Sequence, residues 1–150
     1  MRLVATEYVS LDGVFEVPGV WSGPWFNEEA GQFKFDELRA SDALLLGRRT
    51  YQGFASAWPT MEGTGEFGEK MNSMPKYVVS STLDKVDWTG SRLIKDNVAD
   101  EVEPLKKQPV GALALSGSAT PVHDIRGAEL IDLVRLLGHP VALVTHGPLA

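Results

Sequence analysis

Residues 43–51 of the chain read ALLLGRRTY. The apolar residues 43–46 predict a short strand buried on both faces, since an unbroken apolar run of this length is typical of a central strand in a parallel sheet. Gly47 ends the run, and Thr50 can cap a helix over residues 50–58 that stops before Pro59. A buried strand that turns into a helix is the repeating unit of α/β proteins, so this stretch predicts that class.

The same alternation extends in both directions along the chain. Further strands are expected over residues 2–11, 76–80, 92–94, 111–115, 134–137 and 141–144, and further helices over residues 27–41, 66–72 and 98–107. Strands that alternate with helices favour a layered α/β domain with a mainly parallel central sheet. The chain has 150 residues and shows no repeat, low-complexity tract or linker, so we expect one domain spanning residues 1–150.

The composition excludes several classes of function. With 14 basic and 20 acidic residues the net charge is −6, which argues against nucleic acid or an anionic membrane surface as the partner. The absence of cysteine excludes disulfides, thiolate nucleophiles and cysteine-ligated metals. The three histidines, at 123, 139 and 146, have no metal-ligand spacing, so no metal site is expected. No apolar run approaches the roughly 20 residues of a membrane span, and we expect a cytoplasmic protein that binds a small molecule.

Small and hydroxylic residues follow three of the expected strands. These segments are residues 47–50 (GRRT), 80–82 (SST) and 116–120 (SGSAT). In open α/β sheets ligands bind where the strands end, and phosphates bind at helix N-termini, so the three together indicate an extended ligand with more than one phosphate. Taken singly, each is better explained without a ligand, residues 47–48 and 116–118 as turns and residues 80–82 as a capping cluster. The glycine-rich fingerprints of Rossmann and P-loop proteins are absent from the sequence.

Four segments, in this order, resemble one known family. They are TEYVSLDG (6–13), LLLGRRTY (44–51) followed by AWP (57–59), MNSMPKYVVSSTL (71–83) and SGSAT (116–120). The chain is similar over about residues 1–145 to the dihydrofolate-reductase-like family, in particular to the C-terminal reductase domain of the riboflavin-biosynthesis deaminase/reductase and its stand-alone bacterial relatives. The resemblance implies a three-layer α/β/α fold with NADPH lying across the edge where the strands end.

The resemblance also implies which residues form the site. Cofactor contacts would come from Ala5, Gly13, Gly47, Arg48, Thr50, Ser80, Ser81, Gly117, Ser118, Ala119 and Thr120. Arg48 would hold the 2′-phosphate or the pyrophosphate. Substrate contacts would come from Leu11, Trp21 and Trp25, the two tryptophans lying in a loop over the active site; they can equally be exposed loop aromatics or a dimer contact. Asp12 is the preferred proton donor, with Glu7 and water as alternatives.

Two departures from the family pattern bear on function. Classical dihydrofolate reductases carry an acidic residue on the first helix that fixes the pterin, and the aligned position here is Gly31, with Glu28 and Glu29 close by. The chain ends with residues 145–150 (THGPLA) where relatives continue into a final hairpin strand, so that strand is either missing or diverged. A missing strand would expose a sheet edge that a second subunit can cover, and we therefore expect a homodimer.

These observations lead to one expected function and two alternatives. We expect an NADPH-dependent reductase of a small heterocycle of the pyrimidine or pterin type, as in the reduction of 5-amino-6-(5-phosphoribosylamino)uracil in riboflavin biosynthesis. One alternative is a catalytically inactive, dimeric nucleotide-binding protein that keeps the fold. The weaker alternative is a true dihydrofolate reductase.

Overall fold

The computed structural model describes residues 1–13, 22–25, 27–109, 111–116 and 129–139. Along the chain the elements are β1 (Arg2–Ser10), η1 (Gly23–Trp25), α2 (Glu28–Arg39), β2 (Ala43–Gly47), α3 (Arg48–Ala57), α4 (Gly65–Ser73), β3 (Lys76–Val79), β4 (Ser91–Ile94), α5 (Val98–Lys106), β5 (Ala112–Ser116) and β6 (Leu133–His139). Strands and helices alternate as the sequence predicts. The expected strand over residues 141–144 lies outside the described residues. The same holds for residues 145–150, where we expect the final hairpin strand to be missing or diverged.

The six described strands form one sheet in the order β4-β3-β2-β5-β1-β6, and every neighbouring pair is parallel. The expected α/β class with a mainly parallel sheet is therefore confirmed. All five residues of β2 are buried, as its unbroken apolar sequence predicts for a strand in the middle of a sheet.

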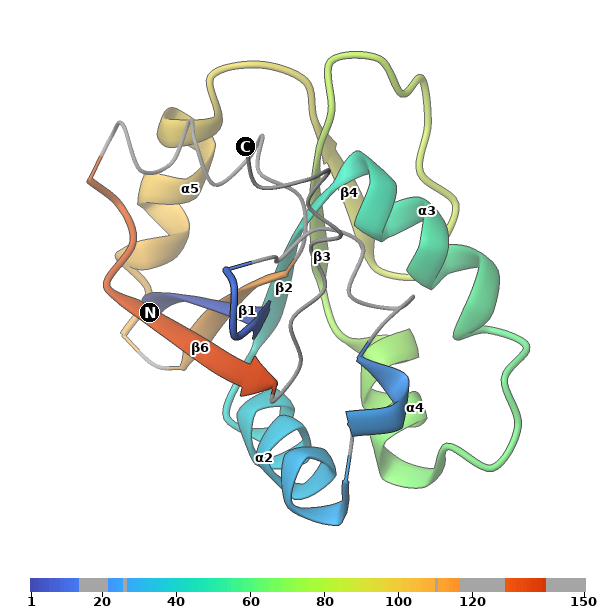
Figure 1. The fold of residues 1–150 in the computed structure, drawn as a ribbon. Helices are drawn as coiled ribbons and strands as arrows, with labels where there is room; N and C mark the ends of the chain where they lie inside the picture. Colours follow the sequence, from blue (N-terminus) through green and yellow to red (C-terminus); the bar gives the residue numbers. More distant parts are fainter. Residues whose placement is uncertain (14–21, 26, 110, 117–128, 140–150) are drawn as a thin grey trace, which may run out of the picture.

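The two faces of the sheet carry two separate cores. Alternate strand residues, among them Leu3, Leu45 and Leu115, pack on one face with Val102 of α5. Their neighbours in sequence turn to the other face, where they pack with residues of α2, α3 and α4. Figure 1 shows α5 on one side of the sheet and α3 and α4 on the other. The result is the expected three-layer α/β/α arrangement.

Helix α3 begins two residues earlier than expected. Gly47, with φ −78° and ψ 165°, is the N-cap, and Arg48 is the first helical residue. The expectation that Thr50 caps this helix is wrong, because the extended backbone of Gly47 leads from the strand straight into the helix and leaves Thr50 in its first turn. Since glycine has no side chain to cap the helix, the first N–H groups of α3 receive no side-chain hydrogen bond from the N-cap.

A buried lysine fixes the loop that follows β3. The side chain of Lys76 is fully buried, and its Nζ donates to the carbonyl oxygens of Asn72 (3.2 Å), Met74 (2.8 Å) and Thr89 (2.8 Å). The ammonium also lies 4.1 Å from the centroid of the Trp88 ring. Burial lowers the pKa of Lys76 to about 8. These contacts tie the end of α4 to the far end of the loop over residues 80–90.

Tyr51 of α3 anchors the same loop from its other side. The Tyr51 hydroxyl accepts hydrogen bonds from the backbone N–H groups of Asp87 (3.0 Å) and Trp88 (3.1 Å). The indole Nε1 of Trp88 donates to Oδ1 of Asn72 at 2.9 Å. The loop that begins with residues 80–82 is thus held between α3 and α4.

Candidate functional site

The strands all end at one edge of the sheet, which we call the carboxyl edge. Because the sheet is parallel, β2, β3 and β5 end nearly level there, at Gly47, Val79 and Ser116, whereas β1 runs about four residues farther, to Ser10. Residues 48–50 and 80–82 follow two neighbouring strand ends, and residues 11–13 follow the end of β1 farther out on the same side of the sheet. Gly117, Ser118, Ala119, Thr120 and Trp21 lie outside the described residues. Trp25 falls in η1.

Arg48 and Thr82 connect two of these groups. Nη1 of Arg48 donates to Oγ1 of Thr82 at 2.6 Å, although 34 residues separate them in sequence. Both residues are exposed. A guanidinium beside the first turn of a helix is a favourable donor set for a phosphate, since the helix N–H groups and the cation attract the same anion. The sequence placed Thr82 in a hydroxyl cluster, but its pairing with Arg48 depends on strands β2 and β3 lying side by side.

The three hydroxyls after β3 have different roles. Ser80 is buried, and its Oγ accepts hydrogen bonds from the backbone N–H groups of Thr82 (3.2 Å) and Leu83 (3.1 Å). Its hydroxyl therefore shapes the turn, which is the capping alternative that the sequence left open. Ser81 is exposed next to it, so Ser81 presents its side chain to solvent at the carboxyl edge.

The end of β1 turns sharply at Gly13. The N–H of Gly13 donates to the carbonyl of Ser10 at 3.1 Å, and Gly13 has φ +83°, a conformation that favours glycine. The Ser10 hydroxyl donates to Oδ1 of Asp12. Leu11 is 75% exposed, and Asp12 is exposed as well. Ala5, by contrast, is 2% exposed within the core on the α5 face, so its side chain meets no solvent.

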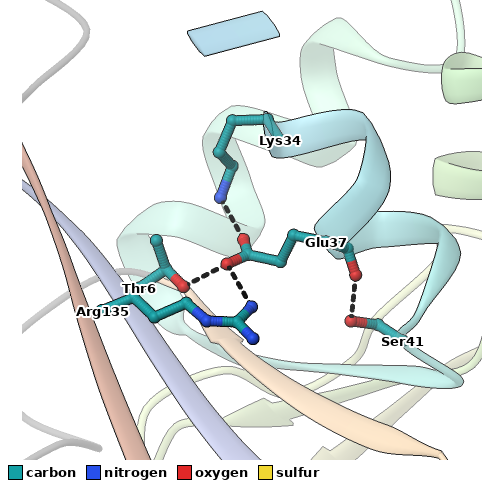
Figure 2. Close-up of polar contacts among 5 residues, drawn as sticks. All are labelled: Thr6, Lys34, Glu37, Ser41 and Arg135. Atoms are coloured by element: carbon teal, nitrogen blue, oxygen red, sulfur yellow. Dashed lines mark hydrogen bonds and ion pairs between the residues drawn. The ribbon is translucent and has the colours of Figure 1, made fainter. Parts of the chain in front are cut away.

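A polar cluster between α2, β1 and β6 was not expected from the sequence. We call Thr6, Lys34, Glu37 and Arg135 the Glu37 cluster. The Glu37 side chain is 8% exposed, and its carboxylate accepts from the Thr6 hydroxyl, from Lys34 Nζ (2.5 Å) and from Arg135 Nη1 (3.3 Å). Figure 2 shows Lys34 and Arg135 reaching this carboxylate from opposite sides. The i, i+3 spacing of Lys34 and Glu37 is visible in the sequence, but Arg135 lies 98 residues away and carries no local signal.

The charges of this cluster are set by burial and by its own ion pairs. Burial by itself would raise the pKa of Glu37, but the charge of Lys34 and the hydrogen bonds from Lys34, Thr6 and Arg135 hold it below its usual value. Burial, and then the Glu37 charge, raise the pKa of Tyr8 to about 12. Glu37 is therefore ionised and Tyr8 neutral at pH 7.

Glu7 occupies the opposite face of β1. It shares the α5 face with Leu3 and Ala5, since side chains alternate along a strand. Burial raises the pKa of Glu7 to about 7, and the positive charge of Lys34 offsets part of the rise. A carboxyl group with such a pKa exists in both protonation states near neutral pH, which suits it to donate or accept a proton.

The first helix carries no carboxylate at the position of the classical pterin-binding acid. Gly31 lies in α2 and is only half-buried, whereas Glu28 and Glu29 are exposed in the first turn of that helix. One turn further along α2 comes Lys34, a cation. Among the described helices, none has the length and apolar character needed to cross a membrane.

The chain has a relative in Bacillus subtilis (strain 168). It is 30% identical over 151 residues to the uncharacterized protein YyaP, covering 99% of this chain and 79% of YyaP. This identity shows that the chain and YyaP belong to one family, but the name of YyaP states no activity.

Solved structures share the fold at low sequence identity. A candidate riboflavin biosynthesis protein from Shewanella sp. PV-4 superposes with a TM-score of 0.69 at 20% identity, covering 95% of this chain and 78% of that one. A pyrimidine reductase-like protein from Corynebacterium diphtheriae gives 0.63 at 12% identity, covering 96% and 76%. The dihydrofolate reductase of Schistosoma mansoni gives 0.57 at 13% identity, covering 98% and 78%. These likenesses confirm the dihydrofolate-reductase-like fold.

A family model identifies the chain more closely. The model of the RibD C-terminal domain matches residues 2–147, almost the whole sequence. Its match spans β1, the β2–α3 junction and the loop after β3, which are the segments that meet at the carboxyl edge. The chain therefore belongs to the RibD C-terminal domain family.

Proposed function

We propose that this protein is an NADPH-dependent reductase that transfers a hydride to a small heterocyclic substrate of the pyrimidine or pterin type. The observation that carries the proposal is the placement of Arg48 at the start of α3, paired with Thr82, in a chain of the RibD C-terminal domain family. The names of the Shewanella and Corynebacterium structures, which refer to riboflavin biosynthesis and to a pyrimidine reductase, support the same class of reaction.

The donor set at the carboxyl edge fits a phosphate-bearing cofactor. The first turn of α3 lacks a capping side chain, and the Arg48 guanidinium and the exposed Ser81 lie at the same edge. Arg48 would hold the phosphate that distinguishes NADPH from NADH, and the N–H groups of α3 would bind a second phosphate group. NADPH, when bound, supplies the hydride from its nicotinamide ring.

The protein's own part in the reaction is to orient the substrate and to deliver a proton. Asp12, exposed at the end of β1 and held by the Ser10 hydroxyl, is our preferred donor. Glu7, with its raised pKa, is the competing one. The proposal also includes a cytoplasmic homodimer, whose assembly state light scattering of the purified protein would measure.

A fluorescence titration tests the cofactor assignment. The purified chain is titrated with NADPH and, in parallel, with NADH while tryptophan emission is recorded. We expect micromolar quenching by NADPH and at least about tenfold weaker binding of NADH, because only NADPH offers the extra charged hydrogen bonds. Binding of neither cofactor would refute the proposal. Tight NADPH binding without NADPH oxidation by any pyrimidine or pterin substrate would favour an inactive nucleotide-binding protein instead.

A further inference from the structure

The Glu37 cluster carries an unbalanced positive charge. It contains two cations, Lys34 and Arg135, and one carboxylate, Glu37, which is ionised. Among the described residues, neither cation pairs with any other acid. Counting only the described residues, one positive charge therefore remains in a half-buried position, in a chain whose net charge is −6.

The groups that face the cluster do not cancel this charge. Tyr8 on β1 is neutral because its pKa is raised to about 12. Glu7 projects from the other face of β1, although the Lys34 charge still reaches it and offsets part of the rise in its pKa. On α2, Asp36 is exposed and accepts a hydrogen bond from Gln32, and Glu28 and Glu29 are exposed in the first turn. A half-buried cation that lacks a full counter-charge favours an anionic ligand.

Lys34 is the member of the cluster that lies nearest the carboxyl edge. Glu37 bonds Thr6, while Lys34 lies against Tyr8, with its Nζ 5.7 Å from the ring centroid. Moving from Thr6 to Tyr8 leads along β1 toward its end at Ser10, so α2 runs antiparallel to β1 and its earlier residues lie nearer that edge. Arg48 follows the end of β2 on this side of the sheet, and Asp12 follows the end of β1 farther out.

The Lys34 ammonium has unused bonding capacity. It can donate three hydrogen bonds, and among the described residues it donates one, to Glu37. Its side chain is 21% exposed, so solvent reaches it. Arg135, by comparison, belongs to the outer strand β6 and approaches Glu37 from the side of Thr6, farther from the edge.

We propose that Lys34 binds an anionic oxygen of the substrate at the carboxyl edge. This inference rests on the proposed function and narrows it, because it assigns to the substrate a carboxylate or phosphate group within reach of α2. The preference is opposite to that of a helix carboxylate, which selects a cationic or amino-bearing ring. Glu37 acts here as a positioning residue that holds the Lys34 side chain in place.

Three probes separate the kinds of anion. Orotate (uracil-6-carboxylate) carries a charge on the ring, uracil is its neutral counterpart, and ribose 5-phosphate carries a phosphate without the ring. Calorimetric titrations with the whole chain, with and without saturating NADP⁺, give each affinity. We expect at least one of the two anions to bind about tenfold more tightly than uracil, the gain typical of a charged hydrogen bond. Equal binding of all three probes would overturn the proposal.

Two variants with opposite expected effects separate binding from a structural role. Lys34→Met should abolish the preference for the anion, and Lys34→Arg should restore much of it. Glu37→Gln keeps a side-chain oxygen that can accept from Lys34 and hold it in place, but it removes the negative charge that competes with the anion, so it should strengthen anion binding about threefold or more. If Lys34→Met and Glu37→Gln weaken binding alike, the cluster is structural and the proposal fails. Lys85→Met is the matched control, because Lys85 is an exposed lysine whose side chain is 80% exposed.

The NADPH titration keeps this inference separate from the proposed function. If NADPH binds but the anions bind no better than uracil, the proposed reductase function is kept and the proposed role of Lys34 is refuted. If the anions bind in a Lys34-dependent way but NADPH does not bind, the proposed reductase function is refuted and the anion site is kept. Competition between NADP⁺ and the anion would assign the anion to the cofactor and overturn the substrate role. Circular dichroism of each variant confirms that it folds.

Discussion

The guanidinium of Arg48 donates to the hydroxyl of Thr82 at 2.6 Å and so joins the ends of two neighbouring parallel strands. Arg48 opens α3 directly after β2, and Thr82 follows β3. The pair places a fixed cation beside the uncapped first turn of a helix, where a phosphate of the cofactor would lie in our proposal.

Replacing Arg48 with alanine tests this placement. Arg48→Ala should weaken NADPH binding about 10- to 100-fold and NADH binding far less, since the arginine would contact a phosphate that NADH lacks. Tryptophan fluorescence gives both affinities. Arg92→Ala is the control, because Arg92 lies at an exposed position, where it forms an ion pair with Glu101 at 3.0 Å. An equal loss for the two cofactors would rule out the 2′-phosphate assignment.

Asp12 and Glu7 can be told apart by turnover. If Asp12 donates the proton, Asp12→Asn should lower kcat by about 10²-fold or more while NADPH affinity stays unchanged. Glu7→Gln should then leave kcat within a few-fold. The measurement is NADPH oxidation with a substrate found by screening pyrimidines and pterins. The reverse result, a large loss in Glu7→Gln alone, would make Glu7 the donor.

Glu7 should also control how stability depends on pH. Its pKa is about 7 in the folded chain against 4.5 for the free side chain, so the folded state binds more protons between these values. The free energy of unfolding should therefore fall as pH rises from about 4.5 to 7. Urea denaturation at pH 5 and pH 8 should show about 1–2 kcal/mol of this loss, after discounting for the solvent that still reaches the carboxyl.

Glu7→Gln removes the titrating group and should flatten that dependence. Glu66→Gln, at an exposed position of α4, is the matched control and should keep the wild-type slope. A slope that survives in Glu7→Gln would show that another group causes it.

Lys76 should matter for stability alone. Lys76→Met leaves three buried or half-buried carbonyls without their donor and should lower the free energy of unfolding by about 2–4 kcal/mol. Urea denaturation measures the loss, and the exposed control Lys85→Met should change it by less than about 0.5 kcal/mol. A neutral outcome for Lys76→Met would show that apolar packing replaces the three hydrogen bonds.

Lys76 should make the free energy of unfolding depend on pH in the direction opposite to Glu7. Its folded pKa of about 8 lies below the usual 10.5, so the unfolded chain binds more protons between these values. The free energy of unfolding should rise with pH across this window in the wild type and not in Lys76→Met.

The sequence predicted those parts of the fold that depend on local pattern. The apolar run 43–46 was expected to be a buried strand, and every residue of β2 is buried. The turn residues and hydroxyls after three strands predicted a common edge of the sheet. Residues 47–50 and 80–82, which the structure describes, do lie at that edge. The cap at Thr50 was wrong because a glycine in extended conformation can start a helix without a capping side chain.

The parts that could not be predicted depend on contacts between distant residues. Lysine at position 76 opens a predicted strand and would be expected in solvent, yet it is fully buried by carbonyls from α4 and from residue 89. Glu37 meets Arg135 only because β6 pairs with β1 across almost the whole chain. Such pairings follow from strand order, which no short segment contains.

The strand order also dictates when β1 can join the fold during synthesis. β1 pairs only with β5 and β6 among the described strands, and its register couples Arg2 to Ala112, about 110 residues later. Strands β2, β3 and β4 can assemble as soon as they leave the ribosome, whereas Leu3, Val4 and Ala5 stay in water until β5 has been made. Strand β1 is therefore without its sheet partners while about 110 further residues are made, and its apolar side chains are open to aggregation during that time.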